Sequence, residues 1–164
     1  NKVSNIQQIL DIFKTLSTTP DKKYMLVHGN TAHGVYRRDP NIQVFIDVTN
    51  VEELHMHTIN DTTIELGGNV SLTDTMKILT EAADSRPDFE YCRTAVKHID
   101  LVANVPVRNT GTLAGNLSIK HEYNEFPSDI FLLLETVGAK LSISKFLGNS
   151  PEHVSKNVVS FYFS

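Results

Sequence analysis

The sequence has a single cysteine and no tryptophan among its 164 residues. One thiol excludes an internal disulfide, an iron–sulfur cluster held by several thiolates and a structural zinc site built on paired cysteines. The lone Cys92 is typical of a small, partly buried residue in a reduced cytosolic protein. We therefore expect a cytoplasmic location and no metal site in this chain.

Basic charge and long apolar runs are also scarce. Lys and Arg number 15 against 19 Asp and Glu, a formal net charge of -4. Nucleic-acid binding needs clustered Lys and Arg, and the basic pair Arg37-Arg38 is too small for that, so we expect no nucleic-acid partner. The apolar run at residues 130–134 is far shorter than the roughly 20 residues that span a bilayer. The first ten residues lack the apolar centre of a signal peptide. We expect no membrane association.

The first third of the sequence predicts a small α/β unit. Apolar residues at helical spacing predict a helix over residues 4–16, with Ser4 as N-cap and Gln7 completing a capping box. Short apolar runs at residues 24–27 and 44–48 predict buried strands. A strand–helix alternation of this kind favours parallel strands, and we place this subdomain at residues 1–54.

The pattern changes after residue 54, and we predict a larger α+β subdomain over residues 55–145. An Asn60-Asp61 turn between apolar runs predicts a hairpin over residues 57–68. Helical spacing predicts helices at residues 72–83, 95–101 and 129–136, the first capped by Ser71 or Thr73 and the last buried, with a strand at 137–143. Residues 146–164 show no clear period and read as an irregular tail, whose apolar end Phe161-Tyr162-Phe163 suggests truncation at the C-terminus.

Two glycine-bearing segments are candidates for binding an anion. One is residues 28–34, directly after a predicted strand, and the other is residues 110–116. Glycine adopts positive φ and lets backbone N–H groups approach an anion, and successive N–H groups form an anion-binding concavity. Neither segment contains Lys or Arg, so binding would rest on backbone dipoles and on Thr and Asn side chains. Neither matches a Walker A or a dinucleotide fingerprint, and each alone reads as an ordinary turn.

Together the two segments resemble a known family. "LVHGNTAHG" resembles the first FAD loop of the aldehyde oxidase and xanthine dehydrogenase family of molybdo-flavoproteins. "VRNTGTLAGNLSI", followed by "FPSDIFLLLETVGAKLSI", resembles its second FAD segment, and "IELGGNVSLTDTMKIL" is similar to the stretch between them. The similarity runs over residues 5–143. Within the family, "RNTGTLAGNLSIKHEYNEFPSD" is closest in tone to insect aldehyde oxidases.

The resemblance implies an α+β fold of the PCMH type, in which FAD lies between a small parallel α/β subdomain and a larger α+β subdomain with a mixed sheet. It also implies the residues that contact FAD. The first loop corresponds to Leu26, Val27, His28, Gly29, Asn30, Thr31, Ala32 and His33. The second corresponds to Gly111, Thr112, Gly115 and Asn116, the ribose and adenine pair to Ser128 and Asp129, and the position beside the flavin to Val102.

The sequence departs from the family pattern at three places. Ala114 replaces the first of two glycines before the Asn, which a negative φ at Ala114 would tolerate. Residues 120–127 form a longer segment than in the dehydrogenases. Val102 stands where xanthine dehydrogenases have an aromatic residue. We expect the backbone at Gly115 to pass close to the FAD diphosphate, in a conformation that other residues resist.

The function implied is electron transfer in a larger oxidoreductase. FAD, bound non-covalently, would receive electrons from iron–sulfur clusters and pass them to NAD or oxygen, after a molybdopterin cofactor has oxidised the substrate. The clusters and the molybdopterin would lie elsewhere in the parent protein, which the resemblance implies is a homodimer. Two alternatives remain open here: an FAD-free fragment or non-catalytic domain, and a stand-alone flavin oxidase of the PCMH type.

Overall fold

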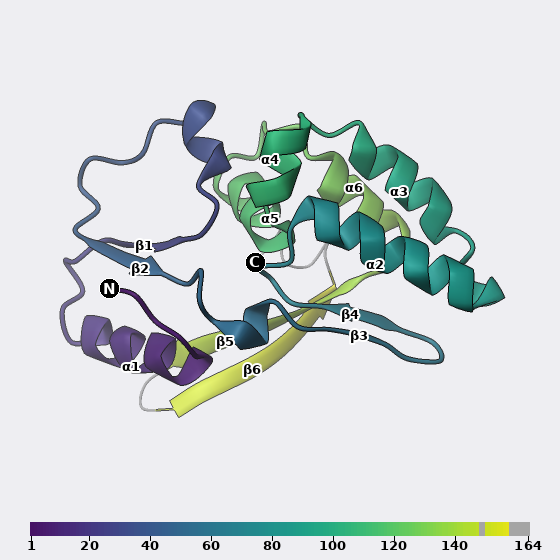
Figure 1. The fold of residues 1–164 in the computed structure, drawn as a ribbon. Helices are drawn as coiled ribbons and strands as arrows, with labels where there is room; N and C mark the ends of the chain where they lie inside the picture. Colours follow the sequence, from purple (N-terminus) through teal and green to yellow (C-terminus); the bar gives the residue numbers. More distant parts are fainter. Residues whose placement is uncertain (148–149, 158–164) are drawn as a thin grey trace.

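The computed structural model describes residues 1–147 and 150–157 (Figure 1). Figure 1 shows the N-terminal strands and helix on one side and a group of helices on the other, with two strand hairpins along the lower edge. In the described residues the strands pair two by two, in three separate sheets, so the mixed sheet expected for the larger subdomain is not found among them. The expected Phe161-Tyr162-Phe163 end lies outside the described residues.

The predicted parallel pairing is confirmed. Strand β1 (Tyr24–Val27) pairs in parallel with β2 (Val44–Asp47), and Leu26 lies opposite Ile46. The strands are less buried than predicted: β1 has no buried residue, and Ile46 is the one buried residue of β2. Residues 1–3 add to the other side of β2, because the Asp47 N–H donates to the carbonyl oxygen of Asn1 at 2.7 Å and the Val3 N–H donates to that of Asp47 at 3.1 Å. Helix α1 (Ile6–Ser17) packs on this unit around a core of Val3, Ile9, Ile46, Val48 and Val51.

Helix α1 begins one residue later than predicted. Its N-cap is Asn5, whose side-chain oxygen accepts from the Gln8 N–H at 2.9 Å. The Gln8 side chain in turn accepts from the Ser4 N–H at 2.8 Å, so the capping pattern is shifted by one position from Ser4 and Gln7. Ser and Asn are equally good caps. The burial of Ile9 and Leu10 in the core therefore determines where the helix begins.

The predicted hairpin is confirmed and leads into the helical group. Strands β3 (His57–Ile59) and β4 (Ile64–Leu66) pair in antiparallel fashion, and the Asn60 N–H donates to the Thr63 carbonyl at 2.8 Å across the turn. Ile59 and Ile64 pack against a cluster of Ala82, Ala83, Phe89 and Cys92. The hairpin therefore supports the C-terminal half of helix α2 (Leu72–Ser85), which Ser71 caps at the other end.

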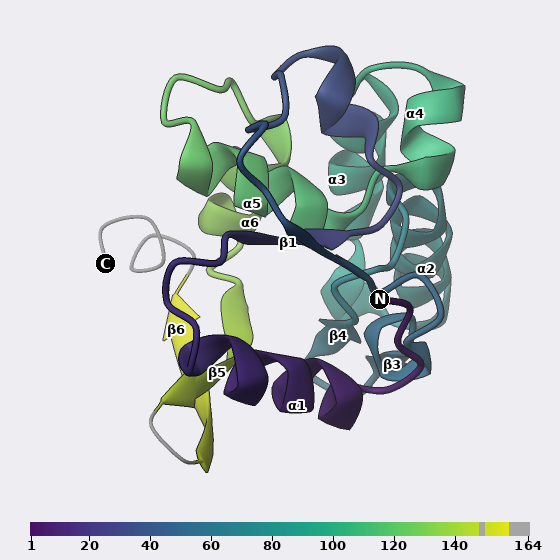
Figure 2. The ribbon, with the colours of Figure 1, turned by 90° about the vertical axis from the view of Figure 1, so that its left-hand side faces the viewer.

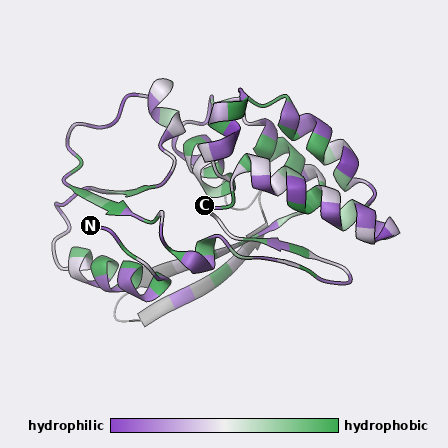
Figure 3. Ribbon diagram, viewed as in Figure 1, coloured by the Kyte–Doolittle hydropathy of each residue, from purple (hydrophilic) through white to green (hydrophobic). Residues whose placement is uncertain are grey.

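The helices share one core. Leu72 of α2, Ile99 of α3 (Cys92–Asp100), Leu113 and Ile130 of α6 (Asp129–Thr136) form a buried cluster. Figure 3 shows hydrophilic and hydrophobic bands alternating along α2 and α3, as expected for helices with one face on a core. Helix α6 is less buried than predicted: Ile130 is enclosed, but Leu132 is 57% exposed.

The segment at residues 110–116 is not the glycine loop that the sequence suggested. Helix α4 (Val105–Thr110) and helix α5 (Leu113–Glu122) nearly meet, and only Gly111 and Thr112 lie between them. Each helix has a side-chain cap: Asn104 accepts from the Val107 N–H, and Thr112 accepts from the Gly115 N–H, both at 3.0 Å. These caps place Gly115 and Asn116 inside a helix.

The last described stretch also differs from its prediction. Strand β5 (Lys140–Leu147) runs beyond residue 143, and β6 (Ser150–Asn157) pairs with it in antiparallel fashion where an irregular tail was expected. Gly138, at φ +66°, ends α6 and directs the chain into β5. Figures 1 and 2 show this hairpin running alongside α1. In the described part of the chain, no helix has the length and apolar character needed to cross a membrane.

Candidate cofactor-binding site

The chain turns sharply where β1 ends. Gly29 and Asn30 both have positive φ, +53° and +57°, in the left-handed region that favours glycine and tolerates asparagine. The Asn30 N–H donates to the carbonyl oxygen of His28, which closes a three-residue turn. The chain then enters a short 3-10 helix, η1 (Thr31–Gly34). This turn and helix form the first segment of the site, residues 28–34.

The first segment presents unpaired backbone donors. Among the described residues, no protein acceptor is found for the N–H groups of Gly29, Thr31 and Ala32. The first N–H groups of a helix have no partner within it, and Asn30, the N-cap of η1, makes no capping bond. Such donors are the groups that bind phosphate and other anions.

The second segment, residues 110–116, is different, and the expectation that its backbone amides are open is wrong for α5. All four amides at the start of this helix are bonded within the protein. Leu113 and Ala114 donate to carbonyl oxygens of the stretch after β4, at 3.4 and 3.1 Å, and Gly115 and Asn116 donate to the Thr112 hydroxyl and carbonyl, both at 3.0 Å. The groups of the second segment that remain to bind an anion are therefore the N–H of Thr112 and the segment's polar side chains.

The glycines of the second segment allow close packing; they do not adopt an unusual backbone conformation. Gly111 has φ of −69°, and Gly115 and Ala114 also have negative φ, which corrects the expected strain at Gly115 and confirms that alanine is tolerated at 114. A Cβ on Gly111 would lie 2.9 Å from the Val107 carbonyl oxygen. A Cβ on Gly115 would lie 3.0 Å from the Thr112 hydroxyl that caps α5.

The two segments touch each other. A Cβ on Gly29 would overlap the carbonyl oxygen of Thr110, and a Cβ on Gly111 would come within 3.3 Å of the Thr31 hydroxyl. Figure 1 shows η1, the short dark blue helix, beside α4 and α5. The structure thus brings together the two segments that the sequence singled out, although many residues separate them.

Comparisons with known proteins now decide the family. Residues 2–155 match the family model described as the FAD binding domain in molybdopterin dehydrogenase. The chain belongs to this family. The family resemblance drawn from the sequence is confirmed, while the insect character stays a prediction.

Relatives and solved structures agree with this assignment. Abscisic-aldehyde oxidase of Arabidopsis thaliana is 30% identical over 145 residues, which are 82% of this chain and 11% of that protein. An indole-3-acetaldehyde oxidase of the same plant is 28% identical over 172 residues, 96% of this chain and 13% of that protein. This FAD domain thus spans a small part of the oxidases that it matches.

Two bacterial structures share the fold. Quinoline 2-oxidoreductase from Pseudomonas putida 86 superposes with a TM-score of 0.67 at 22% identity, over 94% of this chain and 48% of that one. Carbon monoxide dehydrogenase from Hydrogenophaga pseudoflava gives the same TM-score at 17% identity, over 94% of this chain and 49% of that one. The expected α+β fold is confirmed, and the FAD domain corresponds to about half of each of these chains.

The pair expected at the ribose and adenine side lies at the start of α6. Ser128 is only 3% exposed; its hydroxyl donates to the side-chain oxygen of Asn116 and accepts from the Phe131 N–H at 2.9 Å. Ser128 therefore caps α6 and ties it to α5. Asp129, by contrast, is exposed in the first turn of α6 and is open to a ligand.

Val102 occupies a core position. It packs against the buried cluster that contains Ile99 and Leu113, and its carbonyl oxygen accepts from Arg108 at 3.0 Å. Arg108 is buried and also bonds Asp100 at 2.9 Å, which fixes the turn between α3 and α4. Val102 is thus part of the packing of the FAD domain, and a place beside the flavin stays a prediction.

The remaining residues of the first loop divide between strand and helix. Leu26 and Val27 end β1, Leu26 being 46% exposed, and Ala32 and His33 lie in η1. The His28 ring lies 3.3 Å from the Thr49 hydroxyl and stands edge-on to His55, with ring centroids 5.5 Å apart. Partial burial, and secondly the nearby His55, lower the pKa of His28 below 6.5 against the pull of Asp47. His28 is therefore a neutral imidazole at neutral pH.

Sequence reasoning missed two groups at this site. Arg38 donates to the Asn30 side-chain oxygen at 2.7 Å, so a cation does stand at the first segment. Tyr36 stacks on Tyr123, next to Phe126, and joins the chain after η1 to the α5–α6 connection. The Arg37-Arg38 pair was a visible signal, but its partner could not be known. The tyrosines gave no signal, because stacking partners far apart in the chain leave no local pattern.

Proposed function

We propose that this chain binds FAD non-covalently and serves as the electron-transfer domain of a molybdenum hydroxylase of the aldehyde oxidase or xanthine dehydrogenase type. The observation that carries the proposal is the contact between the first segment, with its unpaired N–H groups, and the α4–α5 junction at Thr110 and Gly111. Family membership supports FAD as the ligand.

The residues at the site fit a dinucleotide diphosphate. The N–H groups of Gly29, Thr31 and Ala32 would donate to the phosphate oxygens, together with the Thr112 N–H of the second segment. Glycine at position 29 lets the turn lie directly against the Thr110 carbonyl, which brings the donors of the two segments close together. Ser128 and Asp129 would lie at the ribose and adenine side, where the exposed Asp129 carboxylate can accept from hydroxyl groups and Ser128 holds the start of α6 in place.

The chemistry of the domain divides between cofactor and protein. When bound, FAD supplies the redox chemistry, and the protein supplies binding, orientation and charge. The lowered pKa of His28 favours its neutral form, so the backbone donors and Arg38 would supply the positive side of the interaction with the anion. The described residues hold no group of three or more His, Cys, Asp or Glu placed to bind a metal ion.

The partners proposed for the parent protein follow from the family. Iron–sulfur clusters and molybdopterin would lie in other domains, NAD or oxygen would accept the electrons, and the parent would be a cytoplasmic homodimer. The plant relatives are aldehyde oxidases, and this chain matches 11% and 13% of the two described above. The isolated domain is therefore not expected to complete the full reaction. An FAD-free or stand-alone oxidase reading fits the comparisons less well.

The test is the flavin content of the full-length parent protein. Purified parent is precipitated with acid, and flavin absorbance is measured in supernatant and pellet. We expect FAD in the supernatant. Flavin that stays in the pellet would show a covalent bond, and a well-folded parent without flavin would refute the proposal.

A further inference from the structure

Arg38 lies between the first segment and strand β2, and it is held from both sides. Its Nη2 donates to the side-chain oxygen of Asn30 at 2.7 Å. Its guanidinium carbon lies 5.0 Å from the centroid of the Phe45 ring, a cation–π distance. The Arg38 side chain therefore packs on Phe45 of strand β2, and its guanidinium bonds to Asn30 in the turn at residues 28–30.

The charge of Arg38 is not neutralised within the described protein. None of the described carboxylates forms an ion pair with it, and the neighbouring Asp39 instead pairs with Lys23 at 2.8 Å. The Arg38 Nε is buried and has no hydrogen-bond partner. A guanidinium stays charged at any physiological pH, so its positive charge is available to an anion bound at the first segment. Protein atoms enclose the Nε itself, which would therefore not contact that anion.

The hydrogen bond from Arg38 also changes what Asn30 does. An asparagine at an N-cap normally accepts from the second or third N–H of its helix. Asn30 is the N-cap of η1, yet its side chain makes no such bond and turns to Arg38 instead. Asn30 also sits in the left-handed region, at φ +57°. The left-handed backbone of Asn30 and its bond to Arg38 together keep its side chain away from the N–H groups of η1.

We propose that Arg38 is a positioning residue for the diphosphate of the bound nucleotide. It holds Asn30 away from the N–H groups of the first segment and places a positive charge beside them. The ligand class is a nucleotide with a diphosphate, and the inference rests on the function proposed above. It adds a cationic contribution to a site for which the sequence predicted binding mainly by backbone dipoles and by Thr and Asn side chains.

The experiment compares Arg38→Gln with Arg37→Gln in the full-length parent after FAD has been removed. The two variants lose the same charge from adjacent positions, but Arg37 is exposed and does not contact Asn30. FAD, ADP and riboflavin are titrated at low and high salt. Arg38→Gln is expected to weaken FAD and ADP by the same factor, roughly 10- to 100-fold, because hydrogen bonds to charged groups are strong. The affinity of Arg38→Gln for FAD and ADP should also depend less on salt than that of the wild type. Arg37→Gln should bind FAD, ADP and riboflavin with wild-type affinity.

Riboflavin separates positioning of the diphosphate from general damage, because it has no phosphate. Its affinity should be equal in wild type, Arg38→Gln and Arg37→Gln. Arg38→Lys should lie between wild type and Arg38→Gln, because it keeps the charge and loses the planar fork. Equal losses of affinity for riboflavin and ADP in Arg38→Gln would mean that Arg38 supports the fold and would overturn the inference. Wild-type ADP affinity in Arg38→Gln would also overturn it, while leaving the FAD proposal intact.

Asn30→Gly keeps the proposal testable should Arg38→Gln not fold. Glycine tolerates the positive φ of this position and removes the acceptor of Arg38. No side chain then remains to cover the N–H groups, so this variant tests the placing of the charge alone. Asn30→Gly should weaken ADP binding several-fold because the guanidinium loses its anchor, and unchanged ADP binding would overturn this part of the positioning role. A wild-type parent that binds no FAD would instead refute the proposed function.

Discussion

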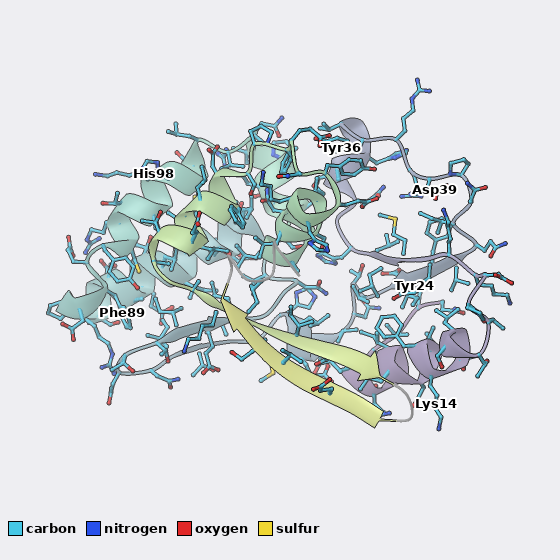
Figure 4. All side chains as sticks on the ribbon, turned by 180° about the vertical axis from the view of Figure 1, so that it is seen from behind. Lys14, Tyr24, Tyr36, Asp39, Phe89 and His98 are labelled. Carbon is cyan, nitrogen blue, oxygen red and sulfur yellow. The ribbon has the colours of Figure 1, made fainter. Side chains whose placement is uncertain are left out.

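Tyr36 and Tyr123 stack face to face, with ring centroids 3.9 Å apart and ring planes 12° from parallel. Phe126 stands edge-on to Tyr36 at 6.1 Å. Figure 4 shows Tyr36 beside the connection between α5 and α6. This connection contains the stretch that we expect from the sequence to be longer than in the dehydrogenases, and it leads directly to Ser128 and Asp129. The stack therefore joins the chain that follows the first segment to the α5–α6 connection, at a place separate from the contact of Gly29 with Thr110.

Tyr36→Ala should loosen the site. An aromatic pair contributes about 0.5–1.5 kcal/mol beyond its buried area, so FAD should dissociate roughly 2- to 10-fold faster. Tyr36→Phe keeps the ring and should retain the wild-type rate. The measurement is FAD dissociation from the full-length parent, followed by the return of flavin fluorescence. Equal rates for alanine and phenylalanine at this position would count against the stack.

Gly29→Ala should be the most damaging small substitution in the first segment. It adds a Cβ that overlaps the Thr110 carbonyl oxygen, at a φ of +53° that alanine resists. We expect loss of FAD and a stability loss of about 1–3 kcal/mol. Gly34→Ala is the matched control, because nothing lies within 4 Å of its Cβ. FAD occupancy and thermal unfolding by circular dichroism measure both effects, and similar results for the two variants would argue against this contact.

Gly115→Val should release FAD while the fold survives, because the added side chain presses on the Thr112 hydroxyl 3.0 Å from its Cβ. The cap of α5 and the adjoining wall of the site must then shift. FAD occupancy, with circular dichroism as the check on folding, measures this. Substitution of His57, in β3, serves as the control and should leave FAD in place. If Gly115→Val keeps FAD and a His57 variant loses it, the assigned segment is wrong.

Asn116→Ala should act on both stability and cofactor. It removes the acceptor of the buried Ser128 hydroxyl and so weakens the tie between α5 and α6. We expect a loss of about 1–2 kcal/mol in stability and FAD binding weaker by roughly tenfold. Ser118→Ala is the control in the same helix, since its hydroxyl bonds only to the Ala114 carbonyl of that helix. Isothermal titration with FAD and thermal unfolding give the two numbers.

The lowered pKa of His28 makes the first segment sensitive to acid. Its folded pKa lies below the unfolded value of 6.5, so the unfolded chain binds the proton more readily. Above 6.5 there is no effect, and stability is lost as the pH falls from 6.5 toward the folded pKa. As the pH falls below 6.5, the temperature at which flavin is released should therefore drop less in His28→Gln than in wild type. His33→Gln, exposed in η1, should behave as wild type; a parallel shift in all three proteins would contradict this.

Local patterns predicted the elements that local interactions determine. Strand β1 was predicted at its observed bounds, Tyr24–Val27, because an apolar run there lies between Lys23 and His28. Ser71 was one of two predicted caps for α2, and it is the one observed. In both cases the decisive residues are neighbours in the chain.

The errors have a common physical origin. A glycine in the sequence can serve a turn or a close approach, and residues 110–116 were read as a turn although Thr112 was a good N-cap for Leu113–Glu122. Strand β6 has a polar sequence without clear alternation, and it exists through its pairing with β5. The contact of Arg38 with Asn30 likewise depends on how the chain folds back after η1, which local pattern does not specify.

The fit of Gly29 against Thr110 also has a consequence for the order of folding. The two residues lie far apart in the chain, so bringing them together closes a long loop. Closing such a loop loses conformational entropy before the contact gives any stabilisation, and such contacts therefore form late in folding. During synthesis, the first segment emerges well before α4 exists to receive it. A growing chain should therefore bind nucleotide only after the helical group has assembled. On heating, it should lose nucleotide binding before the helices themselves unfold.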